Sequence, residues 1–179
     1  MTPILRAVSP RVKARIAGVF WLMVFVAGAL AMAVGRGTVF SVANVVAPLC
    51  YIVVTLLLYD LLEPVNKPVA CIAAIFGLAG CAVSLFGLSR IIVVRDLAFF
   101  GVQCLLVGYL IFNSTFLPRA LGVLLAFAGL GWLTFLWPAL ARALSPYNLM
   151  PGMLGEGLLL LWLIVVGVNV ERWTQQASA

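Results

Sequence analysis

Histidine is absent from this sequence and acidic residues are scarce, because its 179 residues include only five Asp and Glu against eleven Lys and Arg. Without histidine, the chain lacks the commonest protein ligand of haem and zinc and the usual general base at neutral pH. The four cysteines are Cys50, Cys71, Cys81 and Cys104. All lie in apolar runs without a Cys-x-x-Cys pair, and we interpret them as free thiols that act as small apolar packing residues.

Sequence motifs of catalysis are missing as well. The chain has no His-Glu-x-x-His, Gly-x-Ser-x-Gly or Walker loop, and no expected span holds two close carboxylates. The glycine-rich stretch Gly152–Gly157 follows Pro151 at a helix start and lacks the preceding strand of a nucleotide site. The sequence therefore favours a protein without catalytic residues, cofactor or metal site, although a membrane enzyme of an unrecognised type stays open.

Charged residues make up only 9% of the chain, whereas 65% is hydrophobic. So much apolar surface cannot be hidden inside a globule of this size, and the chain needs lipid as its solvent. We predict an all-α, polytopic integral membrane protein built as a bundle of six transmembrane helices. The expected spans are Ile16–Val34, Val39–Tyr59, Val69–Leu88, Leu97–Asn113, Leu117 or Arg119 to Ala141, and Met150–Val170. Ile16–Val34 is longer than a typical signal-peptide core, so we expect it to be retained.

The ends of the chain are polar. Residues 1–15 form a basic N-terminal segment, residues 16–173 the transmembrane domain, and residues 174–179 a polar tail. The N-terminal segment contains Arg6, Arg11, Lys13 and Arg15. It lacks the interleaved aromatic residues of a nucleic-acid site, and we expect it to face anionic lipid on the cytoplasmic side.

Six spans place both termini on one side of the membrane. The side with the termini then carries seven Lys and Arg, and the other side carries the remaining four: Arg36, Arg90, Arg95 and Arg142. Because cytoplasmic loops are enriched in positive charge, we predict a protein of the bacterial cytoplasmic (inner) membrane with both termini in the cytoplasm.

Small residues recur every four positions in two of the expected spans. The first row is Ala27, Ala31 and Gly35, and the second is Ala73, Gly77 and Cys81. Such rows let helix backbones approach closely in lipid. We therefore expect Val69–Leu88 to be the most tightly packed helix, and the protein to act through association with other helices or lipid.

Glu156 is the one acid well inside an expected span, where an ionised side chain costs roughly 3 kcal/mol or more. We expect Asn44, Gln103, Arg95 and Asp96 at a similar outer depth. One interpretation is an outward-facing polar pocket in which Glu156 pairs with an arginine or binds a proton or cation. The other is purely structural, with Glu156 and Asn44 bonding between helices or Glu156 reaching nearby water.

Three stretches resemble a known family. They contain the turn Pro64-Val65-Asn66-Lys67, the segment Leu117–Gly122 (Leu-Pro-Arg-Ala-Leu-Gly), and the last expected span from Gly155-Glu156 to Gly167-Val168-Asn169. In order and spacing these motifs resemble the bacterial multi-pass membrane proteins of domain of unknown function 4386. The resemblance implies a six-helix membrane fold and no established activity.

This chain departs from the family pattern at two positions. Relatives often have His where Gln103 stands, and Arg where Gly77 follows Phe76. An activity that depended on either residue would be lost here.

Three classes of function remain from the sequence. The first is a non-enzymatic membrane protein that acts through helix, lipid or partner association. The second is a small-solute or ion/proton-coupled transporter that uses the pocket around Glu156, and the third is a membrane enzyme. The expected partners are the lipid bilayer and either a second copy of the chain or another membrane protein, not nucleic acid.

Overall fold

The computed structural model describes residues 8–87 and 96–178. Within those ranges the chain forms helices and no strand. The α-helices are α2 (Pro10–Val34), α3 (Thr38–Leu62), α4 (Lys67–Leu85), α5 (Asp96–Asn113), α6 (Arg119–Leu133), α7 (Pro138–Leu144), α8 (Met150–Val165) and α9 (Val170–Ala177), with 3-10 turns at Thr134–Leu136 and Tyr147–Leu149. The predicted all-α class is thereby confirmed.

In the part of the chain that the structure describes, five helical segments are long and apolar enough to cross a membrane. They are Pro10–Val34, Thr38–Leu62, Lys67–Leu85, Arg119–Leu136 and Tyr147–Val165. The sixth expected span corresponds to the apolar stretch Leu97–Asn113 of α5, which is shorter. The chain is therefore an all-helical, membrane-embedded protein with five candidate spans and one shorter apolar helix.

Local sequence explains where several helices begin. Ser9 precedes α2 and its Oγ accepts a hydrogen bond from the Val12 N–H at 3.4 Å. Asn66 caps α4 in the same way, since its Oδ1 accepts from the Val69 N–H at 3.1 Å. Proline follows each cap within the first turn, where its missing N–H costs nothing. The expected turn after the first span is confirmed by Gly35 and Gly37, whose φ angles are 70° and 106°.

The last two expected spans end earlier than the apolar pattern suggested. The helix α6 stops at Leu133, and the chain is extended at Trp137 before Pro138 opens α7. The α region is disfavoured for a residue before proline, and here Trp137 is extended, which separates α7 from α6. The helix α8 ends near Gly167, whose φ is 74°. Beyond it the polar tail forms a further helix, α9.

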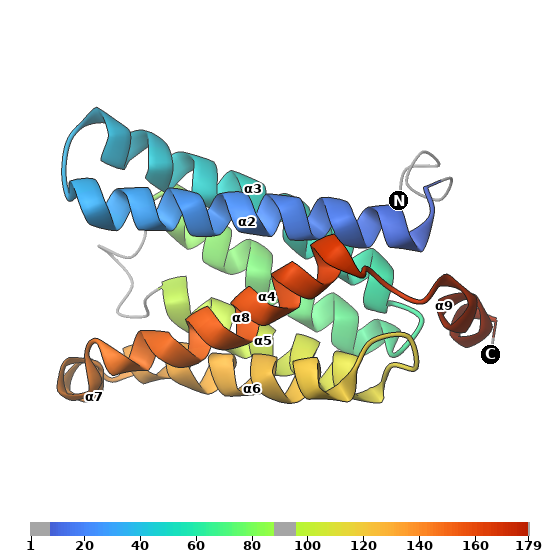
Figure 1. The fold of residues 1–179 in the computed structure, drawn as a ribbon. Coiled ribbons are helices and arrows are strands. Elements are labelled where there is room, and N and C mark those ends of the chain that lie inside the picture. The colour runs from blue at the N-terminus through green and yellow to red at the C-terminus, as the bar shows by residue number, and fades with distance from the viewer. Residues whose placement is uncertain (1–7, 88–95, 179) are drawn as a thin grey trace.

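The six long helices form a closed ring. Each packs against the next one along the chain, and α8 returns to pack against α2. Figure 1 shows α2 and α3 lying together, α5 and α6 lying together, and α8 crossing obliquely from the α6 side to α2. The start of α2 and helix α9 lie at one end of the bundle, which we call the terminal end; the α2–α3 turn and α7 lie at the other, the distal end (Figure 1).

Glycine pairs bring the backbones of α5 and α6 close together. A Cβ added to Gly122 would lie 2.6 Å from the Gly108 carbonyl oxygen, and one added to Gly129 would lie 2.7 Å from the Gly101 oxygen. Backbone therefore meets backbone at both levels. At Gly77 of α4, by contrast, an added Cβ would meet only the Gln103 side chain. The expectation that α4 is the most tightly packed helix is wrong, because glycines face each other across α5 and α6 instead.

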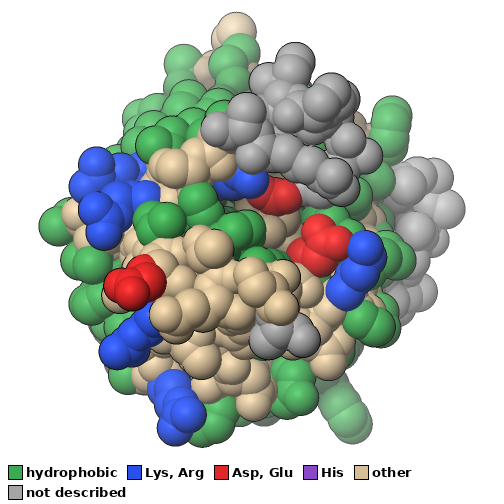
Figure 2. All heavy atoms as spheres, turned by 90° about the vertical axis from the view of Figure 1, so that its right-hand side faces the viewer, with side chains coloured by type: hydrophobic (Ala, Val, Ile, Leu, Met, Phe, Trp, Pro, Cys, Tyr) green, Lys and Arg blue, Asp and Glu red, His purple; other side chains and the backbone are tan. Residues whose placement is uncertain are grey.

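The two ends of the bundle carry different charge. Figure 2 looks onto the terminal end, where blue and red side chains are spread over the surface. The charged residues of the helices that meet at this end are Arg11, Lys13, Arg15, Asp60, Glu63, Lys67, Arg119, Glu171 and Arg172. At the distal end, the described ranges contribute Arg36, Asp96 and Arg142.

The interior of the ring is filled unevenly. Toward the terminal end it is packed with large buried side chains such as Leu61, Leu110 and Leu163. Toward the distal end the buried positions include Ala27, Ala43 and Ala98, although alanines such as Ala14 and Ala70 are buried at the terminal end as well. The distal half of the ring nevertheless holds a cavity between its helices.

Candidate functional site

A cavity of about 500 Å³ occupies the distal half of the ring. All six long helices contribute to its lining, with the second half of α2 and the first half of α3 contributing most. The walls are mainly apolar, and Phe25, Met32, Pro48 and Met153 are among them. Ligand pockets in proteins are typically apolar cavities of about 300–1,000 Å³ with few polar groups. This cavity has that character.

Among the described residues that line this cavity, Glu156 is the one acidic side chain. It is only 6% exposed. The indole N–H of Trp21 donates to its Oε2 at 3.1 Å, and the indole N–H of Trp132 donates to Oε1. The Cys104 thiol lies 3.6 Å from Oε1 and donates to the same oxygen. Residues of three helices, α2, α5 and α6, thus donate hydrogen bonds to the carboxyl group of Glu156 on α8.

The hydrogen bonds leave one acceptor position open. A carboxylate has about four lone-pair sites, two on each oxygen. Two donors occupy Oε1 and one donor occupies Oε2. Within the described ranges, no Lys or Arg forms a salt bridge with Glu156. The carboxyl group therefore keeps room at Oε2 for one further donor and has no counter-ion in this part of the chain.

Two glycines of α8 make this arrangement possible. A Cβ at Gly155 would collide with the Leu124 carbonyl oxygen of α6, so glycine lets α8 approach α6 closely. A Cβ at Gly152 would collide with the ring of Trp132, so glycine leaves the space that the indole occupies. Because Gly152, Gly155 and Glu156 lie on one face of α8, the acid and its partner Trp132 meet at the contact between α8 and α6.

Aromatic side chains close the inner end of the cavity. The Trp21 and Tyr51 rings meet edge to face with centroids 6.1 Å apart, and Tyr51 meets Phe100 at 4.7 Å. Tyr51, Phe100, Trp132 and Glu156 all line the cavity. Edge-to-face contacts hold rings in fixed positions. The indole that donates to Glu156 Oε2 is therefore braced by the aromatic wall.

A second buried acid, Asp60, lies at the terminal end. The ammonium group of Lys13 forms a salt bridge with Asp60 Oδ2, and both side chains are less than a tenth exposed. This pair joins the first turns of α2 to the last turns of α3. Lys13 lies inside α2, which begins at Pro10, so part of the basic segment belongs to the bundle. The charge of Lys13 is neutralised there by Asp60.

The structure distributes the predicted site residues over different surroundings. Glu156 faces the interior of the helical ring, as the cost of an acid in lipid predicts. Asn44 lines the same cavity, but its amide donates to the Phe40 carbonyl of its own helix at 2.8 Å. Arg95 lies outside the described residues. Asp96 begins α5, and its side chain lies outside the description as well.

Gln103 is 2% exposed and lies in another part of the ring. Its amide donates to Thr55 Oγ1 at 3.2 Å, and it does not line the cavity of Glu156. Its Oε1 is buried and has no hydrogen-bond partner among the described residues. Gly77 lies directly against this amide. The two positions where the chain departs from the family pattern therefore touch each other.

Sequence reasoning missed the three donors to Glu156. Tryptophan and cysteine in an apolar span suggest packing or lipid contact, and nothing in their spacing identifies a common partner. One signal was available for Trp21, which follows Ala14, Ala17 and Gly18 on one helical face. Small residues on a face mark where another helix approaches, and Trp21 extends that face into the ring.

Comparisons with known proteins agree with the fold. The family model of "Domain of unknown function (DUF4386)" matches residues 39–98 and 91–167. An uncharacterized protein from Archaeoglobus fulgidus is 28% identical over 149 residues, which cover 76% of this chain and 90% of that protein. No solved structure matches the chain. Because the family matches extend over most of the six-helix ring, the chain belongs to the DUF4386 family of proteins whose function is unknown.

Proposed function

We propose that this protein is a non-enzymatic, membrane-embedded binding protein for a small amphiphilic molecule. The apolar part of the ligand fills the distal cavity, and a basic or hydroxyl group donates to Oε2 of Glu156. One observation carries the proposal: a cavity of about 500 Å³ has mainly apolar walls and one acid among the described residues of its lining. That acid has one acceptor position without a donor.

The chemistry of the site favours a cationic head group. A carboxylate away from water interacts most strongly with an ionised donor, because charge-assisted hydrogen bonds are about twice as strong as neutral ones. A protonated amine would supply both the missing donor and the missing counter-charge. An anionic head group would instead meet Glu156 at close range and be repelled.

Binding of three six-carbon probes tests the proposal. Hexylamine, hexanol and hexanoate share one apolar tail and differ in head-group charge, and calorimetry in lipid nanodiscs gives their Kd values. We expect hexylamine to bind at least roughly tenfold more tightly than hexanoate, with hexanol between them. Equal affinity for all three would contradict the proposal.

Three variants localise this preference. Glu156→Gln should abolish the preference for hexylamine. Gly28→Leu should weaken the binding of all three probes. Gly28 lines the cavity and an added Cβ meets nothing within 4 Å, so the leucine side chain would occupy space that the probes need. Glu171→Gln removes an acid of α9 outside the cavity and should leave the three Kd values unchanged.

The placement in the membrane is part of the proposal. We propose six spans, with α5 as the fourth, in the cytoplasmic membrane of a bacterium with both termini in the cytoplasm. The apolar stretch of α5, the position of α2 and α9 at one end, and the concentration of charge at that end support it. Reporter fusions at residues 2 and 179 test it, and signals from opposite sides would contradict it.

Transport of the bound molecule is the second candidate. Buried polar side chains continue beyond Glu156, first at Gln103 and Thr55 and then at Lys13 and Asp60. Uptake of butyltrimethylammonium by proteoliposomes, lost in Glu156→Gln and kept in Glu171→Gln, would favour transport. Binding without uptake would favour a binding protein.

A membrane enzyme ranks third. The thiol of Cys104 lies 3.6 Å from Glu156, which is a possible nucleophile beside an acid. Cys104 is 2% exposed, however, and it does not line the cavity, so a molecule bound there would not reach the sulfur. Association with a second copy or with another membrane protein is a further expectation, tested by the mass of the purified protein in detergent.

A further inference from the structure

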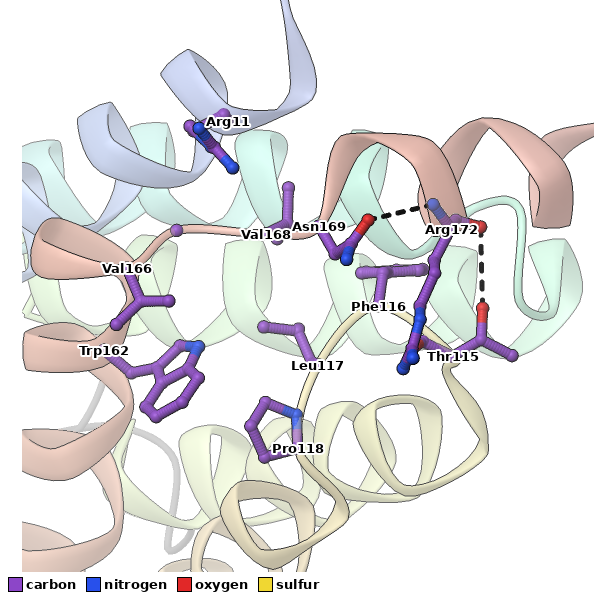
Figure 3. A pocket seen from close by; sticks show the side chains of 11 residues that line it. Arg11, Thr115, Phe116, Leu117, Pro118, Trp162, Val166, Val168, Asn169 and Arg172 are labelled. Atoms are coloured by element: carbon purple, nitrogen blue, oxygen red, sulfur yellow. Dashed lines mark hydrogen bonds between the residues drawn. The ribbon is translucent and has the colours of Figure 1, made fainter.

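A second cavity, of about 350 Å³, lies at the terminal end where α8 gives way to α9. Figure 3 shows its lining, which combines the start of α2, the loop between α5 and α6, and the segment from α8 to α9. Gly167 creates this space, because its φ of 74° turns the chain away from the α8 axis. The Arg11 stem lies against it, with Cγ 3.1 Å from the position of an added Cβ.

The described residues of the lining are rich in hydrogen-bond donors and include no acid. Among the described residues, the Arg11 guanidinium, the Asn169 amide N–H₂ and the Trp162 indole N–H have no acceptor. The Arg172 guanidinium donates one long hydrogen bond, 3.4 Å, to the Thr115 carbonyl. Two positive charges and several unused donors around one cavity are suited to a phosphate group, which offers only acceptors in its ionised form.

The position of this cavity at the expected membrane interface favours a lipid headgroup over a soluble molecule as the source of the phosphate. On one side lie the charged residues of the terminal end (Figure 2). On the other side the surface of α8 is apolar, since Val166 is 47% exposed and Val165 is 69% exposed. Trp162 stands between the two regions, where an indole with one apolar and one polar edge suits the membrane interface.

We propose that this cavity binds one anionic phospholipid. Arg11 and Arg172 hold the headgroup phosphate, with the Trp162 and Asn169 N–H groups as further donors. The acyl chains run along the exposed face of α8 beside Val166. The site is separate from the Glu156 cavity, which lies in the distal half of the ring.

Native mass spectrometry of the full chain with added dioleoylphosphatidylglycerol measures the affinity. We expect one lipid to bind more tightly than dioleoylphosphatidylcholine. Changing both arginines, Arg11→Gln with Arg172→Gln, should weaken phosphatidylglycerol binding by at least roughly tenfold. The matched control is Arg119→Gln, an exposed arginine at the same end that stacks on Phe112 at 5.8 Å and lies outside the cavity. This control should change the Kd by less than about twofold.

Two further results would distinguish a specific lipid site from general attraction to anionic lipid and from a site for soluble phosphate. An equal loss in Arg119→Gln would mean general attraction between the terminal end and anionic lipid, and would overturn the site. Displacement of the lipid by an equal concentration of glycerol 3-phosphate would mean a site for soluble phosphate, and would overturn the lipid assignment. If the double variant fails to fold, Arg11→Gln alone serves, because no hydrogen bond to the described residues holds that guanidinium.

Discussion

Asp60 and Glu156 are buried to a similar extent, 8% and 6% exposed, but they have different partners. Asp60 is matched by the ammonium group of Lys13 at the well-packed terminal end. Glu156 is held by neutral donors on Trp21, Trp132 and Cys104, and it borders a cavity. Burial alone therefore does not mark a functional acid. A compensated charge in a filled region stabilises the fold, whereas an uncompensated carboxyl beside empty space can bind a ligand.

The largest effect should follow from breaking the compensated pair. Lys13→Met leaves Asp60 buried without its cation, which should lower the free energy of unfolding by about 3–5 kcal/mol. Changing both partners, Lys13→Met with Asp60→Leu, should restore stability to within about 1 kcal/mol of the parent, since no unpaired charge remains. Denaturant unfolding in detergent micelles measures both. A single variant as stable as the double variant would show that the pair does not act as a unit.

Replacing one glycine in a packed region and one glycine beside the distal cavity by leucine should change stability differently. Gly122→Leu drives a side chain into the α5 backbone and should cost about 1–3 kcal/mol of stability. Gly28→Leu extends into the distal cavity, and it should leave stability unchanged or raise it by up to about 1 kcal/mol because glycine disfavours helix. Thermal melting of the two variants side by side is the measurement. Equal destabilisation would mean that the distal cavity is not open space.

Glu156→Gln tests how the second acid is held. The carboxyl group accepts at both oxygens, whereas an amide can accept at only one, so at least one donor loses its acceptor. We expect a loss of about 1–3 kcal/mol in the free energy of unfolding, smaller than for Lys13→Met. The same unfolding assay applies, and Glu171→Gln on exposed α9 is the control with no expected change. A loss as large as that of Lys13→Met would place Glu156 among the structural acids.

Gln103→Met should have the smallest effect. The change removes the buried Oε1 that has no partner among the described residues, and it gives up one hydrogen bond to Thr55. These two contributions oppose each other, so stability should stay within about 1 kcal/mol of the parent. Hexylamine affinity should not change, because Gln103 does not line the cavity. A clear loss of affinity would extend the ligand site toward the terminal end.

Much of the fold could be predicted from the apolar pattern. The cost of exposed backbone in lipid forces helices, and the breaks near Gly35 and Pro64 show where they end. The apolar pattern predicts one span to Ala141, yet the helical segment ends before Pro138, because hydropathy does not report the backbone preference of the residue before proline. The sequence predicts a transmembrane domain to residue 173 and a polar tail from residue 174. The structure instead has the separate helix α9 (Val170–Ala177), and Asn169 caps it by accepting a hydrogen bond from the Arg172 N–H at 3.1 Å.

The candidate site could be predicted only in part. The cost of an acid inside lipid was enough to identify Glu156 and to place it against other helices. It could not identify Trp21 and Trp132, because a hydrogen bond between helices depends on the rotation of each helix in the ring. Gln103 was grouped with Glu156 by depth, but it faces Thr55 and Gly77 instead. Depth follows from position along the chain, whereas the facing direction depends on packing.

Infrared difference spectroscopy of the Glu156 carboxyl group tests the central claim most directly, because it observes the proposed anchor while the ligand binds. Adding hexylamine to the protein in nanodiscs should change a carboxyl or carboxylate band. That change should persist in Glu171→Gln, disappear in Glu156→Gln, and need a higher hexylamine concentration in Gly28→Leu. The same difference spectrum in the parent and in Glu156→Gln would contradict the account, since the ligand would then bind without touching Glu156.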